Sequence, residues 1–172
     1  MVETPSYEEI RRIGDVGIRL YPGLILITVS GGGGGSPFNL LFKYISGENV
    51  SRSKISMTTP VITPEKIAMT TPVISGGDAM SFVVPSKYTM KTVPTPTDER
   101  VSIQEMPPRK VAVIKFSGVA RERNVEKNKA RLLSILAENG VETVGEPFLM
   151  RYNSPWIPGF LRRNEIGIEI RE

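Results

Sequence analysis

Residues 165–171 read Glu-Ile-Gly-Ile-Glu-Ile-Arg, so that Ile166, Ile168 and Ile170 occupy every second position. Successive side chains of a β-strand point to opposite faces, and strict alternation of this kind is typical of a strand with one buried face. The sequence therefore predicts a half-buried strand near the C-terminal end of the chain.

Further strands are predicted by alternation and by β-branched composition. They cover 16–20, 24–29, 82–84, 101–106 and 111–116. Pro107-Pro108 separates the last two segments and predicts a turn between them. Tyr7, Ile10 and Ile13 recur at a spacing of three residues, which is compatible with a helix or with a strand.

Two segments have the features of helices. The first, 37–46, begins with Ser36-Pro37, a favourable pair for a cap and a first helical position. The second, 124–139, has Asn124 as its expected N-cap and Gly140 as its expected stop. Its expected apolar face consists of Val125, Leu132, Leu133 and Leu136.

The predicted elements repeat in the order β-β-α-β-β. The first half, about 7–88, consists of hairpin 7–29, helix 37–46 and strands 55–62 and 80–84. The second half, about 101–171, consists of hairpin 101–117, helix 124–139 and strands 146–152 and 165–171. The sequence thus predicts one α+β domain over residues 1–172, in which duplicated β-β-α-β-β units form a distorted open β-barrel flanked by two helices. Such a fold leaves concave apolar surface, which is suited to ligands.

The composition excludes several kinds of site. The chain of 172 residues has no Cys and no His, which excludes disulfides, cysteine zinc sites, a Ser-His-Asp triad and a histidine-ligated haem. A net charge of +4 without a clustered basic stripe predicts no nucleic-acid partner. No signal peptide and no apolar stretch of about 20 residues is visible, so a cytoplasmic protein without a membrane partner is expected.

Two segments do not fit the β-β-α-β-β scheme. Five consecutive glycines, Gly31 to Gly35, are either a natural loop or an engineered replacement. The stretch 54–62 returns as 66–74 with a period of twelve residues. The two copies can form an extra hairpin, or either one can fill a single strand position, so a monomer and a strand-exchanged dimer are both open.

Several separated motifs, in order, resemble the SOUL haem-binding family. They are 41–49 (LFKYISGEN), 66–73 (KIAMTTPV), 80–88 (MSFVVPSKY), 111–118, 142–146 and 151–166 (RYNSPWIPGFLRRNEI). The resemblance covers nearly the whole chain, from about Tyr7 to the end. It implies a fold similar to the effector-binding domains of bacterial regulators, with a tetrapyrrole on an apolar patch between the first helix and the C-terminal loop.

The resemblance also implies which residues meet the cofactor. The candidate cofactor-binding residues are Leu40, Leu41, Lys43, Tyr44, Met69, Tyr152, Trp156, Phe160 and Arg162. Lys43 would approach a propionate, the other helix residues would lie near the ring, and the loop aromatic residues would cover it.

Each of these residues also has a structural interpretation. Met69, like Met57, is either an iron ligand or core filling. Tyr44 and Tyr152 are either phenolate ligands or buried tyrosines with satisfied hydroxyls. Trp156 is either a lid over a flat ligand or an anchor that docks the loop. Arg162, with Arg163, either binds carboxylates or belongs to a structural network, and Lys43 is either a propionate partner or a solvated lysine.

The sequence therefore predicts non-covalent binding of haem or a related tetrapyrrole, or of another flat apolar small molecule, without histidine ligation and without catalysis. One alternative is a sensor or hydrolase for small lipophilic molecules, in which Glu142, Glu146 or Glu165 would be the cavity carboxylate. The other is an interaction protein that forms strand-exchanged oligomers.

Overall fold

The computed structural model of the chain describes residues 2–31, 35–51, 65–153 and 156–172. The helices are α1 (Pro37–Ser46), α2 (Glu122–Glu138) and the short 3-10 helix η1 (Gly159–Leu161). The strands are β1 (Glu8–Ile13), β2 (Val16–Tyr21), β3 (Leu24–Ser30), β4 (Asn49–Val50), β5 (Val73–Gly76), β6 (Ala79–Val83), β7 (Thr95–Pro96), β8 (Val101–Met106), β9 (Arg109–Ser117), β10 (Glu142–Arg151) and β11 (Arg163–Arg171). None of the helices in these ranges is long and apolar enough to cross a membrane.

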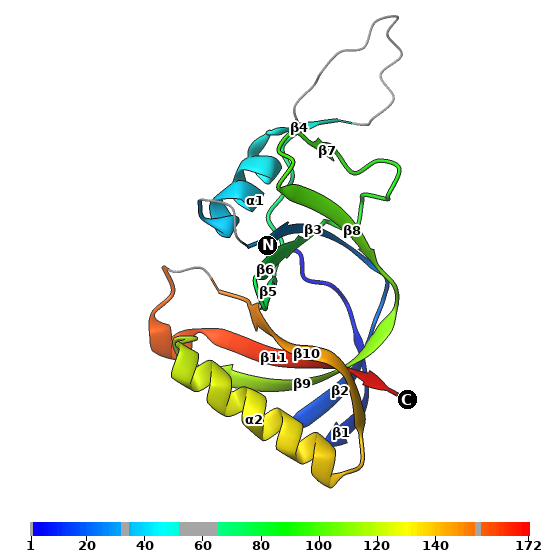
Figure 1. Cartoon of the computed structure of the whole chain (residues 1–172), viewed down its shortest axis with the longest axis vertical. Helices are drawn as coiled ribbons and strands as arrows, with labels where there is room; N and C mark the ends of the chain where they lie inside the picture. Colours follow the sequence, from blue (N-terminus) through cyan, green and yellow to red (C-terminus); the bar gives the residue numbers. More distant parts are fainter. Residues whose placement is uncertain (1, 32–34, 52–64, 154–155) are drawn as a thin grey trace, which may run out of the picture.

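Nine strands form one sheet in the order β1-β2-β9-β11-β10-β5-β6-β3-β8, while β4 pairs with β7 (Figure 1). The β-β-α-β-β order occurs as β2-β3-α1-β5-β6 and again as β8-β9-α2-β10-β11. The equivalent strands of the two units are β2 and β8, β3 and β9, β5 and β10, and β6 and β11. Exchanging each pair reverses the sheet order from β2 to β8, as a two-fold axis between β10 and β5 would do. The sheet ends at β1 and β8 without closing, so the predicted duplicated α+β fold with an open barrel is confirmed.

The first strand of each unit pairs with the other unit. β2 pairs with β9, with Ile18 opposite Ala112. β8 pairs with β3, with Ile103 opposite Ile27. α1 consequently covers β3 and β6 of its own unit together with β8 of the other unit, and Val16 and Ile18 of β2 join the core beneath α2.

The two helices lie on separate parts of the sheet, as Figure 1 shows. α1 contacts β3, β6 and β8, whereas α2 contacts β9, β10 and β11. Under α2 the core contains Val16, Ile18, Ala112, Ile114, Val125, Leu132, Leu136, Leu149, Ile166, Ile168 and Ile170. The isoleucines of β11 therefore face a core as their alternation predicts, and each such buried side chain stabilises the fold by about 1.5–3 kcal/mol.

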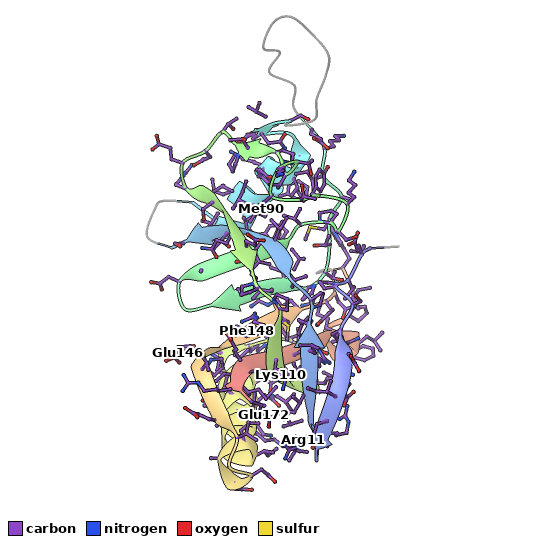
Figure 2. The ribbon with its side chains drawn as sticks, turned by 90° about the vertical axis from the view of Figure 1, so that its right-hand side faces the viewer. Arg11, Met90, Lys110, Glu146, Phe148 and Glu172 are labelled. Carbon is purple, nitrogen blue, oxygen red and sulfur yellow. The ribbon has the colours of Figure 1, made fainter. Side chains whose placement is uncertain are left out.

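The opposite face of the second unit carries a smaller cluster where the two units meet. It consists of Tyr21, Val111, Val113 and Met150, with Tyr7, Ile74, Phe148 and Tyr152 packed against it. Figure 2 shows Phe148 in the middle of the molecule. Its ring crosses Gly167, where an added Cβ would lie 2.8 Å from Phe148 Cε2. Glycine is therefore required at position 167 of β11, directly opposite Phe148 of β10.

The N-terminal segment with two possible interpretations is a strand. β1 forms the outer edge of the sheet, and almost all of its residues are exposed. Its charged side chains, Glu8, Glu9, Arg11 and Arg12, oppose pairing with further strands at this edge.

Two details of the second helix differ from the prediction. The N-cap is Arg121 and has no side-chain cap bond, while the Asn124 side chain donates to the Val119 carbonyl. Leu133, expected on the apolar face, is exposed because it lies beside the buried stripe formed by Val125, Leu132 and Leu136. Gly140 follows the helix with a positive φ of 69°, as a helix stop requires.

The strand predicted at 55–62 lies outside the described residues. In the described part of the first unit, β5 occupies the equivalent position and pairs with both β10 and β6. The second copy of the repeat, 66–74, leads into this strand, whereas the first copy and Met57 are not described.

Candidate functional site

The loop between β10 and β11 exposes a group of apolar side chains. The exposed fractions are 93% for Trp156, 76% for Phe160 and 61% for Leu161, and Ile157 is also exposed. We refer to these four residues as the apolar loop. Concentrated exposure of large apolar side chains is typical of a binding surface.

The backbone of the apolar loop is held against the start of α2. An added Cβ at Gly159 would lie 2.5 Å from Val119 Cγ2, so only glycine allows this close approach. Arg162 Nε donates to the Ile157 carbonyl at 2.9 Å, and the Arg162 carbonyl accepts from the Gly118 amide at 3.1 Å. Because Trp156 is largely exposed, the loop is anchored by Gly159 and Arg162 and not by burial of the tryptophan.

α1 has one buried and one exposed side. The buried side includes three predicted ring contacts, Leu40, Leu41 and Tyr44. The exposed fractions are 0% for Leu41 and 1% for Tyr44. These residues pack the helix against the core and offer no surface to a ligand outside it. On the outer side, the exposed rings of Phe38 and Phe42 stack with their centroids 6.2 Å apart, and Lys43 is exposed.

The predicted iron ligands are engaged in the fold. The Tyr44 hydroxyl donates to the Pro94 carbonyl at 2.6 Å, and burial raises the pKa of Tyr44. The Tyr152 hydroxyl donates to Glu165 at 2.6 Å, and burial together with the Glu165 charge raises the pKa of Tyr152. Met69 is partly buried against the core cluster beneath α1. Both tyrosine hydroxyls are thus engaged as hydrogen-bond donors, and the methionine packs against the core.

A buried ion pair lies on the sheet face that looks away from α2. Arg19 and Glu165 are 2% and 0% exposed, and their two hydrogen bonds measure 2.8 and 2.9 Å. Glu165 also accepts from Tyr152 and from Arg163 at 2.6 Å each, and Arg19 donates to the Tyr21 hydroxyl at 2.9 Å. Burial raises the pKa of Glu165, but the hydrogen bonds from Arg19, Tyr152 and Arg163 outweigh it and lower the pKa to about 2.

Glu165 was considered as a cavity carboxylate, but its pairing with Arg19 was not predicted. Arg19 alternates with apolar residues in its strand, and an arginine at an inward position is the only local signal. A carboxylate that has a lowered pKa and accepts four hydrogen bonds is a poor general base, because it holds a proton too weakly. The pair accordingly has the chemistry of a structural network.

The other two carboxylates considered for hydrolysis lie on the surface. Glu142 is exposed and pairs with Arg171 at 2.8 Å. Glu146 is exposed, and Figure 2 shows it at the outer edge of the molecule.

Two adjoining cavities lie beside the N-terminal segment, and the inner one lies between the two units. The inner cavity, about 20 Å³, is lined mainly by apolar residues of both units, among them Tyr21, Ile74, Val83, Val111, Phe148 and Met150. The outer one, about 540 Å³, runs along 3–6, 22–25 and 83–88. Pro5, Pro22, Leu24 and Val83 line both, so the N-terminal segment forms part of the wall that the two cavities share. The inner volume holds about one water molecule, far less than a macrocycle.

Several solved structures share the fold at low sequence identity. The C-terminal domain of EcmrR has a TM-score of 0.58 and 11% identity, covering 96% of this chain and 98% of that domain. A hydrolase from Listeria innocua has a TM-score of 0.54 and 9% identity, with 94% of each chain covered. An uncharacterized conserved protein from the same organism has a TM-score of 0.56 and 10% identity, covering 91% and 92%. Identities this low establish similarity of fold and nothing about activity.

Comparison with curated proteins found no match. The sequence profile described as SOUL heme-binding protein matches residues 2–169. This match includes the exposed helix α1, the apolar loop and both halves of the sheet. The chain therefore belongs to the SOUL heme-binding protein family.

Proposed function

We propose that the protein binds haem or a related tetrapyrrole non-covalently, on the outer surface formed by the apolar loop and the exposed side of α1. The observation that carries the proposal is the exposure of Trp156 and Phe160 on a loop that Gly159 and Arg162 anchor to the body of the protein. In Figure 1 this loop and α1 both lie toward the left of the view, with α1 above and the loop below it, beside α2. Membership in a family described as heme-binding supports the same ligand.

Stacking on aromatic side chains supplies the affinity in this proposal. Trp156 and Phe160 offer flat faces on the loop, and Phe38 and Phe42 offer them on α1. An aromatic pair contributes about 0.5–1.5 kcal/mol beyond the burial of its area. The exposed Lys43 attracts a propionate, whereas Arg162 acts by holding the loop through the Ile157 carbonyl.

In this proposal the tetrapyrrole binds without a strong bond between a protein side chain and its iron. Tyr44 and Tyr152 keep their hydroxyl protons in hydrogen bonds, and Met69 packs in the core. We therefore expect protoporphyrin without iron to bind about as tightly as haem. A binding protein of this kind acts as a carrier, buffer or sensor and not as an enzyme.

Absorption titrations of the full chain with haemin and with protoporphyrin IX test the proposal. Trp156→Ala and Phe160→Ala should each weaken both ligands about tenfold or more, because each removes one stacking face. Leu133→Ala is the matched control, since Leu133 is an exposed apolar residue on α2. Wild-type affinity in both loop variants, or haemin binding more than a hundredfold tighter than protoporphyrin, would contradict this mode of binding.

A charge variant separates the role of Lys43. Lys43→Ala should weaken protoporphyrin IX but leave its dimethyl ester unaffected, because the ester has no propionate charge. Lys127→Ala is the control, being an exposed lysine on α2. Equal losses for acid and ester would show that Lys43 does not contact a propionate.

The cleft between the two units supports a second candidate function, binding of a small lipophilic molecule. Its inner cavity is lined by Val111, Phe148 and Met150, and Pro5 of the N-terminal segment forms part of its wall. The N-terminal segment is attached mainly at Glu3, whose carbonyl accepts from the Thr71 amide and whose side chain accepts from the Ser86 amide. A ligand would have to displace this segment.

Removal of residues 1–6 tests the second candidate. If the cleft binds lipophilic molecules, Nile red should bind the shortened chain more tightly than the full chain. Unchanged or absent dye binding in a folded shortened chain, as judged by circular dichroism, would count against it.

The cytoplasmic location stays a prediction. The choice between a monomer and a strand-exchanged dimer also stays open, and light scattering distinguishes the two.

A further inference from the structure

We infer that the apolar loop also docks the protein on an anionic lipid surface, lying in the interface without crossing it. This inference goes beyond tetrapyrrole binding, because it requires no porphyrin. It revises the sequence-based expectation of no membrane partner, which considered only spanning segments.

The shape of the apolar loop is suited to a lipid surface. Four large apolar side chains occur within the six residues 156–161, and all four are exposed. Figure 1 shows the segment with η1 at an outer corner of the molecule, beside the first turn of α2. A lipid interface accepts an apolar group that projects from a protein, and tryptophan favours the depth of the headgroups.

The loop presents this group without a large loss of conformational freedom. Gly159 lies against Val119, and the Leu161 amide donates to the Pro158 carbonyl at 2.9 Å. The Arg163 amide donates to the Asn153 side chain at 2.6 Å, at the base of the loop. Since these contacts hold the backbone from Gly159 to Arg163, docking of Phe160 and Leu161 orders mainly side chains.

Positive charge flanks the apolar loop. Arg121 and Arg123 are exposed at the start of α2, next to the Val119 contact, with Glu122 between them. Arg151 is exposed at the end of β10. The N-terminus of α2 adds a partial positive charge at the same corner. Apolar tips surrounded by arginines match a surface of acyl chains beneath anionic headgroups.

Trp156 is the only tryptophan of the chain and reports directly on docking. The experiment mixes the full, porphyrin-free chain with vesicles of phosphatidylcholine containing 30% phosphatidylglycerol, on the order of the anionic content that attracts basic surfaces. Tryptophan emission should shift to the blue, and phosphatidylcholine with brominated acyl chains should quench it. Vesicles of pure phosphatidylcholine should bind at least about tenfold more weakly.

Variants that keep the tryptophan locate the surface. Phe160→Ser with Leu161→Ser should reduce vesicle binding by about tenfold or more, and Arg121→Glu with Arg123→Glu should reduce the preference for anionic lipid. Leu133→Ser, an exposed apolar position on α2, should bind like the wild type. Sedimentation with vesicles checks each fluorescence result.

Several outcomes would overturn the inference. They are no binding, binding without quenching by brominated chains, and binding that the Phe160/Leu161 variant leaves unchanged. A blue shift that depends on protein concentration without vesicles would assign the apolar loop to a second copy of the chain instead. Porphyrin titrations of the same variants without lipid show whether tetrapyrrole binding survives, so failure of docking and failure of the proposed function are distinguishable.

Discussion

Replacement of Glu165 by glutamine removes the negative charge beside the buried Arg19 and keeps the shape of the side chain. In the folded protein the pKa of Glu165 is lowered from the ordinary value of 4.5 to about 2. At about 1.4 kcal/mol per pKa unit, this difference corresponds to about 3 kcal/mol of stability. A similar loss is expected when one partner of a buried ion pair is removed.

The sign of the pH dependence follows from the lowered pKa. The folded state binds the proton of Glu165 more weakly than the unfolded state does, so its contribution is complete above about pH 4.5 and is lost as the pH falls toward 2. The wild type should therefore exceed Glu165→Gln by about 3 kcal/mol at neutral pH, and the two proteins should converge in acid.

Urea unfolding followed by circular dichroism between neutral pH and about pH 3 measures this difference. Trp156 fluorescence is unsuitable because the side chain is already 93% exposed in the folded protein. Glu169→Gln is the control, since Glu169 is on the same strand but is partly exposed and 3.6 Å from Arg109. A stability difference for Glu165→Gln that is absent at neutral pH, or equally large in acid, would refute the reasoning.

Two further substitutions test the packing. Gly167→Ala places a Cβ 2.8 Å from the Phe148 ring and should destabilise the protein by about 1–3 kcal/mol in urea unfolding, whereas Gly23→Ala, whose Cβ meets nothing closer than 3.6 Å, should not show this loss. Equal stabilities for these two variants would contradict the close approach. Tyr44→Phe leaves the Pro94 carbonyl without its donor and should lower the free energy of unfolding by about 1–2 kcal/mol, measured in the same way; an unchanged value would mean that water replaces the hydroxyl.

Local patterns predicted most of the elements. The alternation in β11, the β-branched run in β9 and the Ser-Pro start of α1 each depend on neighbours within a few residues, and the structure has these elements close to the predicted bounds. The N-cap of α2 was wrong because the helix begins three residues earlier, after Arg121, and the Asn124 side chain donates to the nearby Val119 carbonyl instead.

The site depends on distant contacts and was less predictable. Arg19 and Glu165 are 146 residues apart, and only the sheet topology brings their strands to one face. Leu41 and Tyr44 match a family motif, but the same apolar character buries them beneath α1. Trp156 lies in a loop next to prolines. Such a loop has no periodic pattern from which the burial or exposure of a side chain could be predicted.

The cross-pairing of β2 with β9 and of β8 with β3 interlocks the two repeats. Cutting the backbone between β6 and β8 would leave each fragment holding a strand whose hydrogen-bonding neighbour is on the other fragment. Neither piece could complete its own layer, yet the pair could reassemble by complementation. A single repeat could reproduce this geometry only if its first strand paired with a second copy of the repeat. The covalent link between the two repeats in this chain therefore replaces an obligate association of two separate copies.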